Sequence, residues 1–294
     1  MGKTAFIFPG QGSQHVGMGT ELFEDSRVKY LFEIATEVMG FDIRELMLEG
    51  PEQKLNSTEN AQPAIFTDSI ARYQVLVDES CDPDCVLGHS LGEFSALVAA
   101  GCISFEQGIR IVKKRGKLTG NVDVEGSMVA VVGVDSSKVE KIVDEMEEPV
   151  TIANHNSPRQ VVISGREDQL SRSCRKLKEE SAKCIKLDVT GPFHSRFMKG
   201  AEKELKKYID KYDFKDPEVP VLSGVSGEFE RSGPRLQRLL SRQMTHPVRW
   251  VDYVKTLVEF GVDTTVEVGP AATLTKLNQR INPDLEGKRF DEVI

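Results

Sequence analysis

Short apolar runs alternate with amphipathic segments along much of the chain. Residues 5–8, 85–87 and 264–268 are apolar, and each run precedes a turn that contains glycine, which predicts buried strands. Residues 94–100 and 197–209 instead repeat their apolar positions with the period of one face of a helix. Buried strands that alternate with helices are typical of a parallel sheet covered by helices. We therefore predict an α/β fold with a parallel main sheet.

The middle of the chain follows a different order of elements. Its pattern predicts strand, helix, strand, strand, helix and strand in succession, which is the ferredoxin-like order. These predicted elements are residues 128–134, 136–146, 149–153, 160–164, 167–179 and 182–189. We therefore predict a small ferredoxin-like α+β lobe at residues 125–192, inserted into a large α/β-hydrolase-like domain made of residues 1–124 and 193–294. A cleft between two such bodies would suit a small-molecule site.

Composition and charge argue against several function classes. No apolar stretch in the 294 residues approaches the ~20 needed to span a bilayer, and the N-terminus lacks a signal-peptide pattern, so we expect a cytoplasmic protein without a membrane anchor. The formal net charge of −8 argues against general affinity for nucleic acid or an anionic membrane. The five cysteines are scattered and lie far from the histidines, so we expect free thiols and no metal site.

The sharpest chemical signal is a G-x-S-x-G motif, Gly88-His89-Ser90-Leu91-Gly92. An apolar strand precedes the motif and a helix of small and apolar residues follows it, which is the strand–turn–helix of a nucleophile elbow. In that setting the glycines relieve crowding around a strained serine, and the helix N-terminus offers N–H donors to developing negative charge. We therefore predict that Ser90 is a nucleophile.

A serine nucleophile needs a base, and histidine is the usual one. His194 has the best setting of the five histidines, because it follows a predicted strand and a Gly191-Pro192 turn and precedes a helix. A histidine with only a structural role in this turn would fit the same pattern. His89 is adjacent to Ser90, so its side chain should point away from the serine hydroxyl. No acidic residue stands out as the third member of a triad.

A helical projection of residues 105–118 places one cation on the apolar face. Arg115 lies one turn from Ile111 and from Leu118, whereas the lysines of this segment face the other way. A buried guanidinium that lacks its anion would cost ~3–5 kcal/mol, so Arg115 needs a negatively charged partner. That partner is either Glu93, in an internal ion pair, or a carboxylate brought by a ligand, which the planar guanidinium suits.

The glycines of residues 10–19 do not form a nucleotide-binding motif. Gly10 and Gly12 supply the first half of G-x-G-x-x-G, but His15 occupies the place of the third glycine, and no Gly-Lys-Ser/Thr sequence follows. These glycines therefore need another explanation.

Several motifs that extend along nearly the whole chain are together highly specific. They are FPGQGSQHVGMG, NAQPA, GHSLGEFSALVAAG, KRGKL, ANHNSPRQVVISG, GPFHS, HPVRW and EVGP. With these motifs the sequence resembles the malonyl-CoA:acyl carrier protein transacylases, the discrete acyltransferases of fatty acid synthesis. The resemblance implies transfer of a malonyl group from CoA to the pantetheine thiol of acyl carrier protein through an acyl-serine, without a metal or redox cofactor.

The resemblance also implies a role for each candidate residue. Ser90 would carry the acyl group, His194 would be its base, and Arg115 would pair with the malonyl carboxylate. The backbone N–H groups of Gln11 and Leu91 would form the oxyanion hole, so the glycines beside Gln11 would let the chain approach the thioester. If the pKa of His194 is unperturbed, the activity of the enzyme would fall below about pH 6.5, where the imidazole becomes protonated.

Three further residues have implied roles. A main-chain carbonyl in the HPVRW segment, near Arg249, would orient the histidine in place of the missing acid. Gln62 and Asn156 would line the cleft. The chain departs from the family pattern at residues 118–120, which read Leu-Thr-Gly where relatives usually carry a Met-Gln pair, and at Gly224, where Asn is common. The first departure leaves the fine acyl preference open.

Other functions fit the same elbow. A trans-acting acyltransferase of a polyketide pathway would use a different carrier protein, and a serine hydrolase or thioesterase would pass the acyl group to water. The missing acid and the presence of Arg115 count against a hydrolase, and a catalytically silent scaffold would have no use for these residues.

We expect a monomer that docks an acidic carrier protein near the cleft on basic residues such as Arg172, Arg175 and Lys176.

Overall fold

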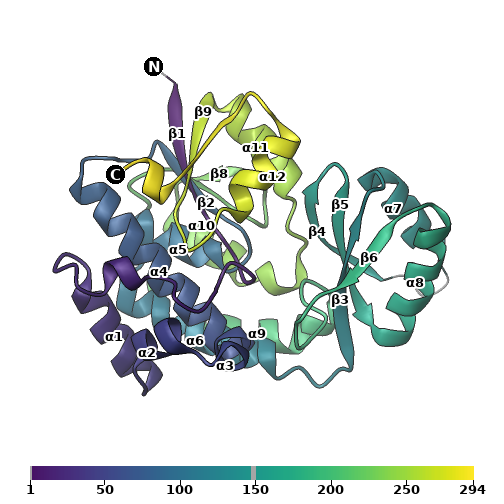
Figure 1. Cartoon of the computed structure of the whole chain (residues 1–294), viewed down its shortest axis with the longest axis horizontal. Coiled ribbons are helices and arrows are strands. Elements are labelled where there is room, and N and C mark those ends of the chain that lie inside the picture. The colour runs from purple at the N-terminus through teal and green to yellow at the C-terminus, as the bar shows by residue number, and fades with distance from the viewer. Residues whose placement is uncertain (1, 147–149) are drawn as a thin grey trace.

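The structure, a computed structural model, describes residues 2–146 and 150–294, and its strands form two sheets (Figure 1). The larger sheet has the spatial order β10 (Glu286–Arg289), β9 (Val262–Glu267), β1 (Lys3–Phe8), β2 (Cys85–Gly88), β7 (Val221–Leu222) and β8 (Phe229–Glu230). Its neighbouring strands are parallel except β7 and β8, which are antiparallel. The apolar runs at residues 5–8, 85–87 and 264–268 fall on β1, β2 and β9, so the predicted α/β class is confirmed, with a mixed rather than wholly parallel sheet.

The pairing of β1 with β2 brings two loops to one edge of this sheet. Phe8, the last residue of β1, lies opposite Gly88, the last residue of β2. Because parallel strands end at the same edge, the glycine loop that begins after Pro9 and the turn that holds Ser90 leave the sheet side by side. The backbone N–H of His89 donates to the Phe8 carbonyl at 2.9 Å and extends this contact beyond the strands.

Alternation along β1 decides which helices cover each face of the sheet. Phe6 and Phe8 belong to one buried cluster, whereas Ala5 and Ile7 belong to another. The first cluster draws on α1 (Lys29–Met39), α2 (Ile43–Glu49), α3 (Glu52–Asn56), α4 (Thr58–Asp78), α5 (Gly92–Ala99), α6 (Phe105–Gly120), α9 (Lys199–Ile209) and α10 (Gly233–Leu240), and the second on α11 (Trp250–Glu259) and α12 (Thr273–Ile281). Within residues 2–146 and 150–294, no helix has the length and apolar character that crossing a bilayer requires.

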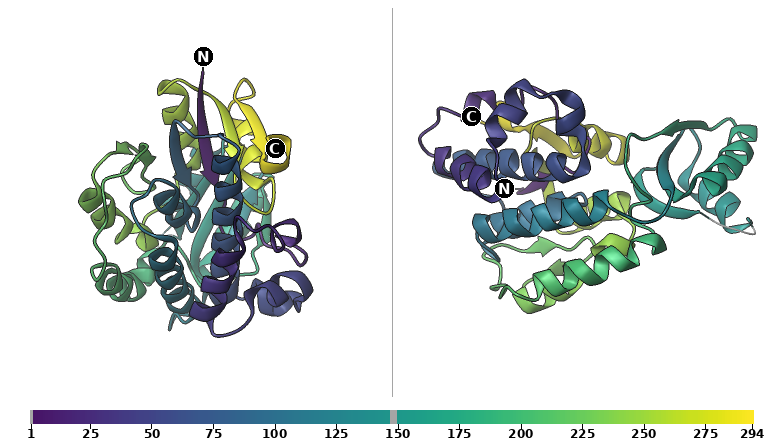
Figure 2. Two further views of the ribbon diagram at one scale, coloured as in Figure 1. Left: turned by 90° about the vertical axis from the view of Figure 1, so that its left-hand side faces the viewer. Right: turned by 90° about the horizontal axis from the view of Figure 1, so that it is seen from below.

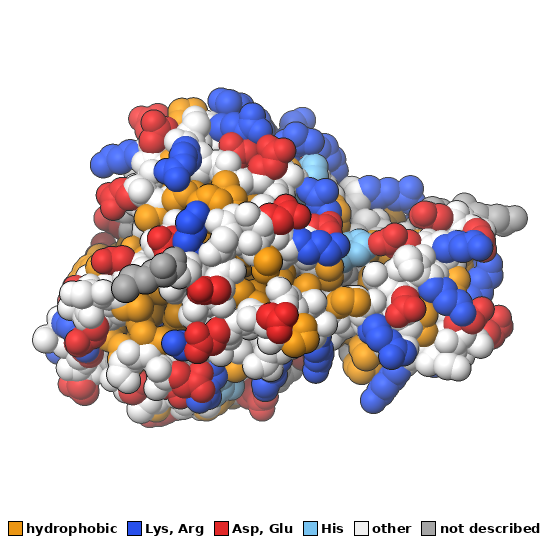
Figure 3. All heavy atoms as spheres, turned by 90° about the horizontal axis from the view of Figure 1, so that it is seen from above, with side chains coloured by type: hydrophobic (Ala, Val, Ile, Leu, Met, Phe, Trp, Pro, Cys, Tyr) orange, Lys and Arg blue, Asp and Glu red, His pale blue; other side chains and the backbone are white. Residues whose placement is uncertain are grey.

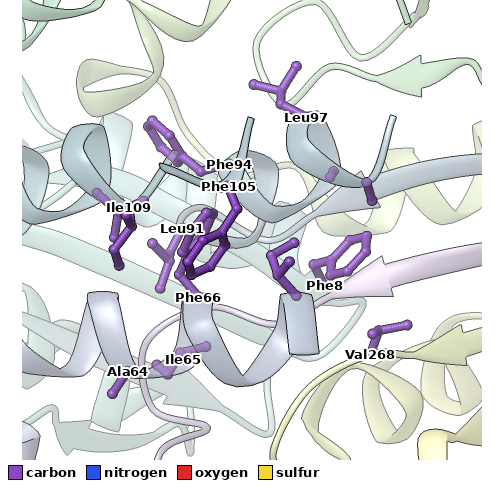
Figure 4. Close-up of a cluster of buried hydrophobic side chains, with 14 of the residues drawn as sticks. Phe8, Ala64, Ile65, Phe66, Leu91, Phe94, Leu97, Phe105, Ile109 and Val268 are labelled. Atoms are coloured by element: carbon purple, nitrogen blue, oxygen red, sulfur yellow. The ribbon is translucent and has the colours of Figure 1, made fainter. Parts of the chain in front are cut away.

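Close packing of α4 against α6 sets the position of the helix that carries the predicted buried cation. The rings of Phe66 and Phe105 stack with their centroids 5.5 Å apart, and both lie in the buried cluster of Figure 4. A Cβ at Gly108 would lie 2.5 Å from Cζ of Phe66 and 2.9 Å from Cγ2 of Val98. Only glycine therefore lets α6 approach this closely without a shift of its neighbours.

The smaller sheet is built from the middle of the chain. Its antiparallel strands have the spatial order β4 (Thr151–Ser157), β5 (Gln160–Arg166), β3 (Gly126–Val132) and β6 (Lys183–Lys186), with α7 (Ser136–Asp144) and α8 (Glu167–Glu179) in the connections. Each of the predicted middle elements is present; α8 has the predicted ends and the others have shifted ends. Residue 149, where one strand was predicted to begin, lies outside the described residues. The last strand is shorter than the predicted 182–189, because the chain turns where the Val189 N–H donates to the Leu187 carbonyl.

The two faces of the smaller sheet have different partners. Val129 and Val131 pack with the apolar side chains of α7 and α8, whereas Met128 and Val162 join the core of the large domain. In Figure 1, α7 and α8 accordingly lie on the side of this sheet away from the large domain. Figure 2 shows the residues of this sheet projecting from one side of the molecule.

The segment before α11 and helix α12 both form hydrogen bonds to the smaller sheet. Val248, just before α11, donates its N–H to the Ala153 carbonyl and accepts from the His155 N–H, both at 2.8 Å. On α12, Arg280 donates to Oε1 of Gln160 at 3.1 Å. The segment before α11 is therefore part of the large domain and also hydrogen-bonded to the smaller sheet.

Replacing Gly108 by Ala should lower the free energy of unfolding by about 1–3 kcal/mol, because the new methyl group overpacks the contact between α4 and α6. Chemical denaturation of the purified protein measures this change. Gly200→Ala on α9 is the matched control, since a Cβ at Gly200 would meet no atom within 4 Å. The control should leave the stability unchanged or raise it slightly. Equal losses in the two variants would contradict the packing argument.

Candidate active site

A cavity of about 360 Å³ lies between the carboxyl edge of the larger sheet and the inner face of the smaller one. The predicted site residues that line it are Gln11, Gln62, Ser90, Leu91, Arg115, Asn156 and His194. They come from the loops after β1 and β2, from α4 and α6, from β4, and from the turn before α9. Segments that are far apart in the sequence thus converge on one site, at the edge where β1 and β2 both end.

Ser90 has the strained backbone expected of a nucleophile elbow. Its φ is +52°, in the left-handed region that side chains other than glycine rarely adopt. A Cβ at Gly88 would lie 1.9 Å from the main chain of Gly92, and a Cβ at Gly92 would lie 2.0 Å from the Phe8 carbonyl oxygen. The glycines of the motif are therefore required by close approach of main chain to main chain.

His194 lies within hydrogen-bonding distance of the serine hydroxyl. Its Nε2 is 2.8 Å from Ser90 Oγ, and its Nδ1 is 2.8 Å from the carbonyl oxygen of His246. Since a carbonyl can only accept, Nδ1 carries the proton, and the lone pair of Nε2 faces the hydroxyl. The serine hydroxyl then donates to Nε2, which is the arrangement that a general base requires.

The carbonyl that orients the imidazole belongs to His246, the first residue of the predicted HPVRW segment, and not to Arg249. The Arg249 carbonyl accepts from the N–H groups of Asp252 and Tyr253 in the first turn of α11 and is not available to His194. The Arg249 side chain points elsewhere and donates to the Val225 carbonyl at 3.1 Å. The main chain still takes the place of a triad acid, three residues earlier than predicted.

Burial, reinforced by the positive charge of Arg115, lowers the pKa of His194 to about 3. The imidazole is therefore neutral at pH 7 and ready to accept a proton. The limit of about pH 6.5 that an unperturbed imidazole would set on activity does not apply to this buried site.

Arg115 is buried in the cavity wall, with 4% of its surface exposed. Its Nη1 donates to Oε1 of Gln62 at 2.7 Å, and its Nη2 donates to Ser90 Oγ at 2.9 Å and to Oε1 of Gln243 at 3.1 Å. Its Nε has no hydrogen-bond partner among the residues that the structure describes. Burial lowers the pKa of Arg115 to about 10, with the charge of Glu93 opposing, so the group stays protonated at pH 7.

Gln243, which the sequence pattern did not single out, separates Arg115 from Glu93. Its Nε2 donates to Glu93 Oε2 at 2.5 Å and to the Ser90 carbonyl at 2.7 Å, while its Oε1 accepts from Arg115. Within the described part of the chain, the internal ion pair considered for Arg115 does not form. A single glutamine produces no periodic pattern or motif from which its role could be predicted. Only the position of Gln243 just before the HPVRW segment indicates a role.

The glycine loop lies directly against the elbow. A Cβ at Gly10 would lie 2.6 Å from the His89 carbonyl oxygen, so glycine lets the loop approach this closely. Gln11 follows and its side chain donates to Thr58 Oγ1 at 3.2 Å. Leu91 is 1% exposed and immediately precedes α5, whose first N–H groups, those of Gly92, Glu93 and Phe94, donate to the carbonyls of His89, Ser90 and Leu91. Gln11 and Leu91 thus lie on the two segments that meet at Ser90.

His89 and two asparagines of the smaller sheet contact one another in the cavity wall. His89 Nε2 is 3.0 Å from Asn156 Oδ1 and 3.4 Å from Asn154 Nδ2. Its ring lies against Trp250, with the ring centroids 5.6 Å apart. As predicted, the side chain of His89 engages partners other than the Ser90 hydroxyl. Sequence reasoning singled out Asn156 and missed Asn154, although both lie on β4.

The elbow, the Ser90–His194 pair and the neutral imidazole define the class of enzymes that work through an acyl-serine. A family model described as acyl transferase domain matches residues 5–287. The chain belongs to this family.

Several relatives and solved structures are similar to this chain over most of both chains. The malonyl CoA-acyl carrier protein transacylase of Bacillus subtilis (strain 168) is 40% identical over 293 residues, which cover 97% of this chain and 92% of that protein. A crystal structure of an acyl carrier protein S-malonyltransferase from Vibrio cholerae superposes with a TM-score of 0.93 at 38% identity, over 98% of this chain and 96% of that chain. A malonyl-transacylase solved with a type II polyketide acyl-carrier protein, PlMCAT:AntF, has a TM-score of 0.93 at 36% identity, over 98% and 95% of the two chains.

The depressed pKa of His194 predicts a pH profile without an acid limb near pH 6.5. The kcat/KM of acyl transfer should stay constant from about pH 8 down to about pH 5, because the free enzyme keeps its imidazole neutral throughout that range. Replacing Arg115 by Met removes a positive charge that disfavours the imidazolium, so it should move the acid limb upward. A limb near pH 6.5 in the unmodified protein would contradict the burial argument.

Proposed function

We propose that this protein transfers a malonyl group from CoA to the pantetheine thiol of acyl carrier protein through an acyl-serine at Ser90. The observation that carries the proposal is the buried Arg115 guanidinium, which donates to Ser90 Oγ at 2.9 Å and has no carboxylate partner of its own among the described residues. A malonyl group on Ser90 Oγ brings a free carboxylate to that cation. The names of the relatives in Bacillus and Vibrio support the same substrate.

In the first half-reaction, Ser90 Oγ attacks the thioester carbonyl of malonyl-CoA. His194 Nε2 takes the hydroxyl proton, and the backbone N–H groups of Gln11 and Leu91 stabilise the tetrahedral oxyanion. When the intermediate collapses, the carbon–sulfur bond breaks and the thiolate of CoA receives the proton from His194. Ser90 is left as a malonyl ester.

In the second half-reaction, the pantetheine thiol of the carrier protein gives its proton to His194 and attacks the ester. The oxyanion forms again on Gln11 and Leu91, and Ser90 Oγ leaves with the proton from His194. The nucleophile is regenerated, so the cycle is ping-pong. CoA and pantetheine arrive as substrates, and the proposed steps need no metal or redox cofactor.

A carrier protein of polyketide synthesis is the second candidate acceptor. The similarity to PlMCAT, which was solved with a type II polyketide carrier protein, favours it. The chemistry at Ser90 is the same in both cases, and only the docking partner differs. A hydrolase or thioesterase is less favoured, because the carboxyl group of a triad is replaced here by the His246 carbonyl.

We further propose that the smaller sheet with α7 and α8 is a ferredoxin-like lobe of residues 125–192 inserted into an α/β-hydrolase-like domain. The order β4-β5-β3-β6, with each neighbouring pair antiparallel, supports the ferredoxin-like description. The elbow after β2 supports the hydrolase-like one. A monomeric state and a cytoplasmic location remain predictions.

The carrier protein is better placed at the mouth of the cavity than on α8. The expected docking residues Arg172, Arg175 and Lys176 lie on α8, which packs on the face of the smaller sheet opposite the cavity. Helix α12, which lines the cavity through Leu277, carries Lys276 and Arg280 at its surface. Figure 3 shows Lys and Arg side chains gathered near the junction of the two bodies.

Replacing Ser90 by Ala should abolish the covalent malonyl adduct that forms on incubation with malonyl-CoA, because the acceptor oxygen is removed. Intact-protein mass spectrometry detects the adduct. Ser95→Ala is the matched control, since Ser95 is a buried serine of the adjoining helix α5, and it should acylate normally. An adduct that persists on Ser90→Ala would refute the assignment.

Replacing Arg115 by Ala should lower kcat/KM for malonyl transfer about 100-fold more than for acetyl transfer, because only malonyl carries the free carboxylate. Steady-state rates with the two acyl-CoA substrates give the ratio. Arg110→Ala, on the exposed face of the same helix, is the control and should leave both rates unchanged. Equal losses for the two substrates would show that Arg115 has only a structural role.

A further inference from the structure

A buried carboxyl–amide pair lies beneath the reacting groups. Glu93 is 1% exposed and Gln243 is 4% exposed, and neither side chain lines the cavity. Glu93 comes from the first turn of α5, directly after the elbow, and Gln243 comes from a short 3-10 helix (Gln243–Thr245) some 150 residues away. Two polar side chains buried at a contact between distant segments need hydrogen bonds that compensate for the loss of water.

The Gln243 amide uses both of its ends. Its NH₂ group donates to Glu93 Oε2 and to the Ser90 carbonyl, and its oxygen accepts from Nη2 of Arg115. The same Nη2 donates to Ser90 Oγ. One amide therefore holds the main chain of the nucleophile and the guanidinium in a fixed relation to each other.

Glu93 decides which way this amide faces. A carboxylate can only accept, so it requires the NH₂ end of Gln243 and leaves the oxygen end for Arg115. Its second oxygen, Oε1, accepts from the Gly224 N–H at 2.9 Å. A Cβ at Gly224 would lie 2.9 Å from Glu93 Oε2, so the glycine found where asparagine is common leaves room for the carboxylate. Both carboxylate oxygens are therefore anchored.

We propose that Glu93 and Gln243 are positioning residues that keep the Arg115 guanidinium directed at the acyl group on Ser90; the inference rests on the proposed malonyl transfer. Burial raises the pKa of Glu93, while the donors of Gly224 and Gln243 and the charge of Arg115 oppose that rise. In its ionised form Glu93 places negative charge near Arg115 without binding it, because the neutral amide of Gln243 lies between them. No carboxylate among the described residues therefore occupies the guanidinium, which stays available to the carboxylate of the ligand. A direct Glu93–Arg115 ion pair would draw those donors away from the cavity.

The isosteric change Glu93→Gln tests this arrangement. A glutamine at position 93 can present an NH₂ group to Gln243, which would turn the Gln243 amide so that its own NH₂ faces the cation. We expect the ratio of malonyl to acetyl kcat/KM to fall about 10-fold, with a smaller change for acetyl transfer. Glu230→Gln, at a buried glutamate paired with Arg235, is the matched control and should leave the ratio unchanged.

Two further variants separate positioning from a merely structural role. In the Arg115→Ala background, Glu93→Gln should have no further effect on the ratio, because it acts through Arg115. The exchange Glu93→Gln with Gln243→Glu keeps volume and net charge but puts a carboxylate directly beside Arg115. Thermal unfolding shows whether the exchanged protein folds, and we expect it to fold and to lose malonyl preference at least 10-fold, since the new carboxylate competes with that of the substrate.

An unchanged ratio in both Glu93→Gln and the exchanged protein would overturn the positioning role. So would equal effects of Glu93→Gln with and without Arg115. Malonyl acylation of the unmodified protein, followed by mass spectrometry, is measured in parallel. If that adduct fails to form, malonyl transfer itself is refuted; if it forms and the ratios do not move, only the positioning role is refuted.

Discussion

The parallel pairing of β1 with β2 is the constraint on which the site depends. It ends both strands at one level, so that the glycine loop and the elbow leave the sheet in contact. Contact this close excludes side chains: a Cβ at Gly10 or Gly92 would lie 2.6 Å or 2.0 Å from a main-chain carbonyl oxygen of the neighbouring segment. Gly10, which did not fit a nucleotide-binding motif, thus lets the loop that carries Gln11 lie against the elbow. Gln11, Ser90, Leu91, Arg115 and His194 all line the cavity at this junction.

A second feature of the site is that neutral groups occupy places where acidic groups would cancel the charge of Arg115. The His246 carbonyl orients His194 where an aspartate would place a negative charge, and Gln243 separates Glu93 from Arg115. Both choices leave Arg115 as a buried cation without a carboxylate partner among the described residues, next to the nucleophile. Such a cation is unfavourable in an empty site, and an anionic acyl group relieves it. The free enzyme is therefore less stable than one in which this cation is paired with a carboxylate. Binding of an anionic acyl group recovers that difference in free energy as affinity.

Local patterns in the sequence predicted the elements and residues whose signal is local. The apolar runs marked β1, β2 and β9, the G-x-S-x-G context marked Ser90, and the helical projection marked Arg115 as buried. What could not be predicted depends on contacts between distant segments. A carbonyl has no sequence signature, so choosing His246 over Arg249 requires knowing where α11 begins. Gln243 has a role only because α5 and the segment before α11 meet, and the basic residues of α8 fall on the far face only because α7 and α8 cover the same side of their sheet.

Arg115 links substrate recognition to the state of the base. Its charge is one of the two main causes of the lowered pKa of His194, after burial. In the free enzyme this repulsion keeps the imidazole neutral, which is the form that accepts the serine proton. A malonyl carboxylate on the guanidinium would cancel much of that charge, so the imidazolium that forms during attack would become easier to create. An acetyl group brings no such compensation. Selectivity for a carboxylate would then arise in the proton-transfer step as well as in binding, from one and the same cation.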